Sequence, residues 1–80
     1  MDSLKKLELL YRKTDIFMTF NKFRIGQSMF LALSEIDNPL ASKLTGSEAD
    51  CFYNDDLCSD FIITVLEAWN NNEGEKNVKR

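Results

Sequence analysis

Apolar residues recur at steps of three and four along most of this chain, which is the spacing of one face of an α-helix. The first such segment covers residues 3–20, where charged residues fill the opposite face. Its predicted buried stripe consists of Leu4, Leu7, Leu10, Tyr11, Phe17 and Met18. We expect this helix to end at Asn21 and Lys22, because Asn tolerates the left-handed conformation that often closes a helix.

A second helix is predicted over residues 24–36. Its apolar stripe is Ile25, Met29, Ala32, Leu33 and Ile36, with Phe30 to the side. Gly26 is unusual there, since Gly near the start of a helix costs up to ~1 kcal/mol relative to Ala. Such a residue is best tolerated where another backbone comes close, and we expect a helix crossing at Gly26.

Pro39 predicts a new, short helix over residues 39–45, because Pro disfavours a helical residue before it and suits the first helical turn. We expect Asn38 to be its N-cap and Gly46 to stop it. A fourth helix is predicted over residues 55–69, with acidic residues in its first turn that favour the helix dipole. Its inward stripe is Leu57, Phe61, Ile62, Val65, Leu66 and Trp69.

These segments predict an all-α fold, a small single-domain bundle of four helices within residues 1–69. The chain has 80 residues and is 44% hydrophobic, enough for one packed core and too short for two. Residues 70–80 are polar and predict a disordered C-terminal tail.

Charge is distributed unevenly although the formal net charge is only −3. Residues 1–24 hold six basic and three acidic side chains, a local charge of +3, whereas residues 25–69 hold one Lys against eight Asp or Glu, a local −7. Such polarity steers encounters with charged partners. Acidic residues interrupt the basic segment and the whole chain is acidic, and both facts argue against direct nucleic-acid binding.

The composition also argues against an enzyme. The chain contains no His, the usual general base at neutral pH, and the sequence around Ser28 lacks the second Gly of a nucleophile elbow. Cys51 and Cys58 are too few for a disulfide scaffold and favour reduced, partly buried thiols. We therefore predict no catalytic, metal-binding or cofactor-binding residues. No apolar run is long enough for a signal peptide or a membrane span, so we expect a cytoplasmic protein that does not enter a membrane.

Two short stretches combine charge with large apolar side chains: residues 24–27, Arg-Ile-Gly-Gln, and residues 50–56, which we call the acidic-aromatic loop. Phe52 and Tyr53 lie in a connection, where aromatic residues either close the end of a bundle or anchor a partner. Arg24 could pair with Asp50 or Asp55 and so join the two stretches. The candidate partner-binding residues are Arg24, Gln27, Tyr53, Asn54, Asp55, Asp56 and Asp60.

The order of these signals resembles a loose group of short bacterial and bacteriophage proteins, generally of unassigned function. The group has an R-x-G-Q helix followed by a D-P-F-Y segment and an acidic helix start. This chain matches the three features at residues 24–27, at Asp50-x-Phe52-Tyr53 and at Asp55-Asp56. It departs from the pattern at Cys51, where the group has Pro. The resemblance implies a small module that binds and modulates, or inhibits, a host protein. Two alternatives remain open. The acidic surface could mimic a nucleic-acid backbone and occupy a nucleic-acid-binding protein, or the chain could self-associate through Leu9, Phe20 or Ile63 as a homo-oligomeric structural protein.

Overall fold

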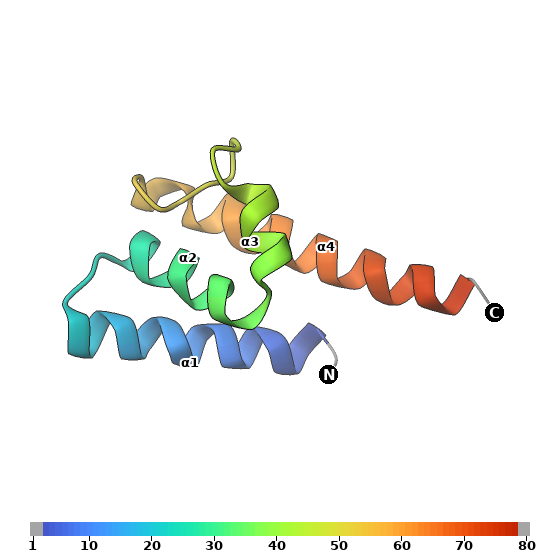
Figure 1. Cartoon of the computed structure of the whole chain (residues 1–80), viewed down its shortest axis with the longest axis horizontal. Coiled ribbons are helices and arrows are strands. Elements are labelled where there is room, and N and C mark those ends of the chain that lie inside the picture. Colours follow the sequence, from blue (N-terminus) through green and yellow to red (C-terminus); the bar gives the residue numbers. More distant parts are fainter. Residues whose placement is uncertain (1–2, 79–80) are drawn as a thin grey trace.

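The computed structural model describes residues 3–78, with side chains up to residue 71. These residues form four α-helices and one turn of 3₁₀ helix, and the all-α fold predicted from the sequence is confirmed (Figure 1). The elements are α1 (Ser3–Asn21), α2 (Ile25–Ile36), α3 (Asn38–Leu44), η1 (Asp55–Leu57) and α4 (Cys58–Val78). None of these helices is both long and apolar enough to cross a membrane.

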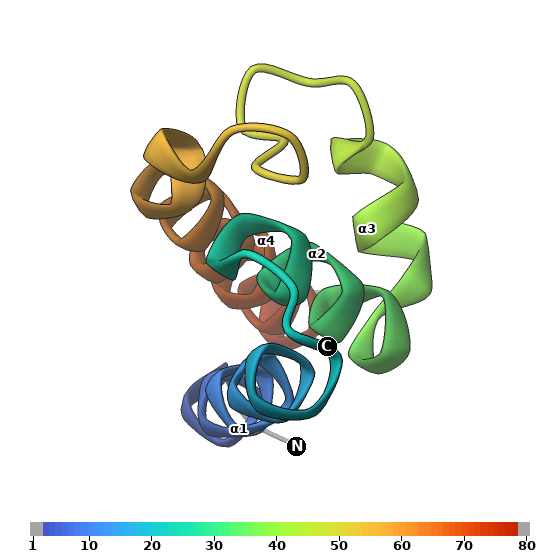
Figure 2. The ribbon, with the colours of Figure 1, turned by 90° about the vertical axis from the view of Figure 1, so that its left-hand side faces the viewer.

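Helix α2 lies at the centre of the bundle, between the other elements (Figure 2). It packs most extensively on α1 and then on α3, and it also contacts η1 and α4. Its sequence fits this position, since Met29, Phe30, Ala32 and Leu33 are all buried. Ile25, predicted to face the core, is instead 40% exposed.

The core is closed by the single tryptophan of the chain, Trp69 on α4, which is almost fully buried. Its indole nitrogen donates a 2.8 Å hydrogen bond to Asp37 Oδ2, and the other oxygen of Asp37 accepts from the Leu40 amide at 3.2 Å. Asp37 is therefore the N-cap of α3, and the prediction of Asn38 was wrong. The cap lies one residue earlier because the Asp37 side chain also accepts the hydrogen bond from Trp69 of α4. Sequence spacing cannot show such a contact between distant segments. Gly46, with a φ of 78°, follows the end of α3 as predicted.

The predicted stripe of α1 divides into two rows. Leu7, Leu10 and Phe17 pack on the core, together with the buried Thr14. A second row, Leu4, Tyr11 and Met18, is exposed, contrary to the prediction. The reason is that α1 packs chiefly on one neighbour, α2, and a single neighbour covers a narrower strip than the apolar face provides.

The fourth helix was predicted to begin at residue 55, but residues 55–57 form η1 and α4 begins at Cys58. It continues to Val78, beyond the predicted end at residue 69. The predicted disordered tail therefore differs from the structure over residues 70–78, while residues 79–80 lie outside the described residues. No proline interrupts this segment, and Gly74 alone costs a helix only ~1 kcal/mol. A polar composition thus does not by itself prevent helix formation.

Candidate functional site

An ion pair joins the two stretches that stand out in the sequence. The Arg24 Nη1 atom lies 2.8 Å from Asp55 Oδ1, and Arg24 Nη2 donates to the Phe52 carbonyl oxygen at 2.8 Å. The same Asp55 oxygen accepts a 3.0 Å hydrogen bond from the Gly26 amide at the start of α2. Of the two pairings open at the sequence level, Arg24 with Asp55 is the one that forms. It fastens the acidic-aromatic loop to the first turn of α2.

Gly26 allows this close approach. A Cβ atom at that position would lie 2.7 Å from Asp55 Oδ1 and would overlap the Cys51 carbonyl oxygen. Close approach of another backbone was predicted and is confirmed, but the backbone belongs to the loop and not to a crossing helix. The predicted helix crossing at Gly26 was therefore wrong, because a loop distant in sequence lies over the start of α2.

Side chains within the loop also fix its shape. Asp50 accepts hydrogen bonds from the amides of Gly46 at 2.7 Å and Phe52 at 3.0 Å. Asn54 accepts from the Asp56 amide at 3.0 Å and is the N-cap of η1. The carboxylates of Asp50 and Asp55 thus satisfy backbone donors and Arg24. In the part of the chain that the structure describes, the exposed Asp56 takes part in no ion pair.

The two aromatic residues of the loop have different environments. Phe52 is half-buried, and its ring meets the Phe30 ring edge-on with 5.9 Å between centroids. Tyr53 is 83% exposed, and its ring rests against that of Phe52 at 4.8 Å. Phe52 therefore closes this end of the bundle, whereas Tyr53 adds little to the core.

The loop and the start of α2 bring together most of the predicted contact residues. Arg24, Tyr53, Asn54, Asp55 and Asp56 come from these two connected segments, and all are exposed. Gln27 is half-buried one turn beyond Arg24. Asp60 belongs elsewhere, on the exposed side of α4, where it lines a shallow depression with Glu48 and Ile63.

Both cysteines are free thiols, as predicted. Cys51 is fully buried, and its thiol donates to the Gly26 carbonyl oxygen at 3.3 Å. Burial, reinforced by the nearby Cys58, raises the pKa of Cys51 to about 12, and burial also raises the pKa of Cys58. Both thiols remain protonated at neutral pH, and a protonated thiol is a poor nucleophile and a poor metal ligand. Among residues 3–71, whose side chains the structure describes, no cluster of three or more Cys, Asp or Glu side chains could hold a metal ion.

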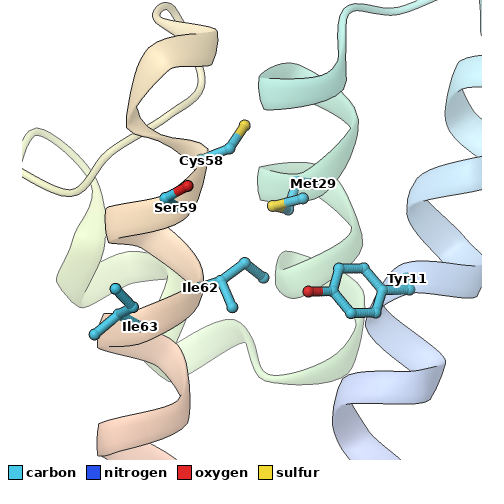
Figure 3. A pocket seen from close by; sticks show the side chains of 6 residues that line it. All are labelled: Tyr11, Met29, Cys58, Ser59, Ile62 and Ile63. Atoms are coloured by element: carbon cyan, nitrogen blue, oxygen red, sulfur yellow. The ribbon is translucent and has the colours of Figure 1, made fainter.

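A groove between α1 and α4, with α2 at its floor, was not predicted. Its volume is about 390 Å³, and its lining residues are Tyr11, Met29, Cys58, Ser59, Ile62 and Ile63 (Figure 3). The Tyr11 ring projects from α1 toward Ile62, and Met29 lies between them on α2. The seven-residue spacing of Leu4, Tyr11 and Met18 was the signal in the sequence that could have indicated a second apolar row.

Comparison of the chain with protein-family models, with curated proteins and with solved structures found no match. The resemblance to short bacterial and bacteriophage proteins stays a prediction. Functional inference therefore depends on the geometry of the loop and of the groove.

Proposed function

We propose that this protein is a non-enzymatic protein-binding module and that the acidic-aromatic loop carries its contact surface. The observation that supports this proposal is the exposed Tyr53 ring on a loop fastened at several points. Tyr53 would be the anchor, with Asn54 and Asp56 beside it and Arg24 at the edge. A module of this kind acts by occupying a surface of its partner, as a modulator or inhibitor of a host protein does.

Rigidity is what makes an exposed tyrosine effective in binding. A side chain or loop that becomes ordered only on association loses roughly 0.5–1.5 kcal/mol of affinity per immobilised side chain. The Tyr53 ring is already supported by Phe52, and its loop is held by Asp50 and Asp55. Tyrosine also combines a large apolar ring with a hydrogen-bonding hydroxyl, which is why it is enriched at interface centres.

The loop is a weaker candidate for a nucleic-acid mimic. Asp50 and Asp55 direct their carboxylates to backbone amides and to Arg24, so they contribute less to an outward negative field than the sequence suggests. Among the described residues neither Asp50 nor Asp56 has an ion-pair partner, but Asp50 is held by two backbone amides. A phosphate mimic needs a row of outward-facing charges.

Photo-crosslinking in cells of the native host would test the proposal. A crosslinkable phenylalanine analogue at position 53 is expected to capture a partner protein, whereas the same analogue at the exposed Ser42 on α3 is not. Tyr53→Ala should abolish co-purification of the captured protein while leaving the thermal unfolding midpoint unchanged. Equal capture from positions 53 and 42, or undiminished co-purification with Tyr53→Ala, would refute a contact surface on this loop.

A further inference from the structure

Tyr11, which lines the groove on the α1 side, is the middle residue of the exposed apolar row of α1. Leu4, Tyr11 and Met18 are 70%, 48% and 37% exposed, and steps of seven residues place them in line along the helix. At about 1.5 Å per residue this row extends over roughly 21 Å of the helix axis. Such a row is long enough to contact about four turns of another helix.

The opposite rim belongs to α4. Ile62 and Ile63 face the groove there, and Ile63 is 54% exposed. The floor is Met29 of α2, whose flexible thioether adapts to differently shaped apolar partners (Figure 3). The groove is therefore mainly apolar, with the Tyr11 and Ser59 hydroxyls as polar groups on its two walls.

Acidic residues flank the apolar centre of each wall at the same spacing. On α1, Glu8 and Asp15 lie three residues before and four residues after Tyr11. On α4, Asp60 and Glu67 lie at the same steps from Ile63. All four carboxylates are exposed, and residues at these steps share one face of a helix. Glu8 also lines a separate depression on α1 with Lys5, Leu9 and Arg12, so the acidic charge beside the groove comes chiefly from Asp15 on α1 and from Asp60 and Glu67 on α4.

We propose that this groove binds a basic amphipathic helix of another protein. Apolar side chains of that helix, spaced at three and four residues, would enter between Tyr11 and Ile63, and flanking Lys or Arg residues would meet the acidic rims. The helix would lie beside α2, between α1 and α4. This surface is separate from the acidic-aromatic loop, so an experiment can refute one of the two proposed binding sites without refuting the other.

A second copy of the chain is a poorer occupant. The row Leu4, Tyr11 and Met18 is flanked by Glu8 and Asp15, so two copies joined through this row would bring like charges together; α1 also exposes Ile16 and Phe20, on another side of the helix. Like charges across an interface cost affinity and select against that partner. The charge pattern of this row thus favours a foreign basic helix over symmetric pairing of two copies through it.

A synthetic peptide tests the proposal directly. The probe is an 18-residue peptide of Leu and Lys with leucines at helical spacing, labelled with fluorescein and titrated with the intact protein by fluorescence anisotropy. We expect a dissociation constant on the order of micromolar at low salt. A peptide of the same composition with the leucines scrambled, and one with Glu in place of Lys, should each bind at least about tenfold more weakly. Equal binding of either control would overturn the proposal.

Substitution in the groove provides the matched test on the protein. Ile63→Lys should weaken binding of the basic peptide at least about tenfold, because it places a charge in the apolar wall and opposes the peptide charge. Ser42→Lys adds the same charge on an exposed part of α3 and should change little. Tyr11→Lys, on the other wall, repeats the test if Ile63→Lys does not fold. Unchanged binding in the folded variants would refute the groove, and a dimer in light scattering that Ile63→Lys dissociates would replace the foreign helix by a second copy.

Discussion

Replacing Gly26 by Ala separates helix propensity from loop docking, because the two effects have opposite signs. In an exposed helix, Gly→Ala stabilises by up to about 1 kcal/mol. Here the added Cβ would lie 2.7 Å from Asp55 Oδ1, closer than the roughly 3.3 Å of ordinary carbon-oxygen contacts, and would also overlap the Cys51 carbonyl oxygen. The loop must therefore move away from α2.

The expected cost follows from the contacts that such a movement weakens. The hydrogen bond from the Gly26 amide to the charged Asp55 contributes about 1.5–3 kcal/mol, and overpacking costs about 1–3 kcal/mol. The Arg24–Asp55 pair is partly exposed and contributes at most about 1 kcal/mol. Because a retreating loop relieves the overlap as it loses the hydrogen bond, these terms are not additive. After subtraction of the propensity gain, Gly26→Ala should lower the free energy of unfolding by about 2 kcal/mol.

Urea unfolding followed by the fluorescence of Trp69 would measure this change. With a slope of about 1–2 kcal/mol per molar urea for a domain of this size, the midpoint should fall by about 1–2 M. Gly46→Ala is the matched control: nothing lies within 4 Å of its Cβ position, and its φ of 78° alone predicts a loss of about 1 kcal/mol. In an Asp55→Ala background, Gly26→Ala should cost less, since one overlapping atom has gone. A Gly26→Ala protein as stable as the wild type would refute loop docking on α2.

Three further predictions concern buried polar groups. Because burial raises the pKa of Cys51 to about 12, the unfolded chain releases the thiol proton at lower pH than the folded chain. The free energy of unfolding should therefore fall by roughly 1 kcal/mol per pH unit above about pH 9. Cys51→Ala should reduce this dependence on pH, measured by urea unfolding at pH 8 to 10. Asp37→Ala removes both the α3 cap and the acceptor of the Trp69 indole and should cost about 2–3 kcal/mol in the same assay, whereas a loss below 0.5 kcal/mol would contradict the double role. Ser28 has a buried hydroxyl without a hydrogen-bond partner among the described residues, so Ser28→Ala should stabilise by about 1 kcal/mol, and a lower thermal midpoint would disprove this.

Local signals predicted the helices well. Pro39 marked the start of α3 within a residue, and the acidic cluster at Asp55 marked the turn that leads into α4. The periodicity of α4 identified Phe61, Val65 and Trp69 as buried, because that helix runs along the core for several turns. Each of these features depends on residues near one another in the sequence.

What the sequence did not predict depends on contacts between distant segments. Periodicity shows that α1 has an apolar face, but it cannot show that α2 covers only part of it and leaves Tyr11 exposed. Gly26 indicated a close approach without identifying the loop that approaches. Opposite charge alone left Asp50 and Asp55 as equal partners for Arg24, and only the geometry of the first turn of α2 distinguishes them, since Asp55 also reaches the Gly26 amide.

The distribution of charge over the structure separates the two proposed surfaces. In the loop, Asp55 is paired with Arg24 and the Asp50 carboxylate is turned to backbone amides, so binding through Tyr53 should depend mainly on ring burial and respond weakly to salt. The groove keeps exposed carboxylates on both rims, including Asp15 and Glu67, and charges of this kind are screened beyond about 8–10 Å at physiological ionic strength. Raising the salt concentration should therefore slow association of a basic helix with the groove while it leaves a partner of the loop bound. If one natural partner showed strong salt dependence and lost affinity with Ile63→Lys but not with Tyr53→Ala, the groove would be the principal binding site and the loop chiefly a structural closure of the bundle.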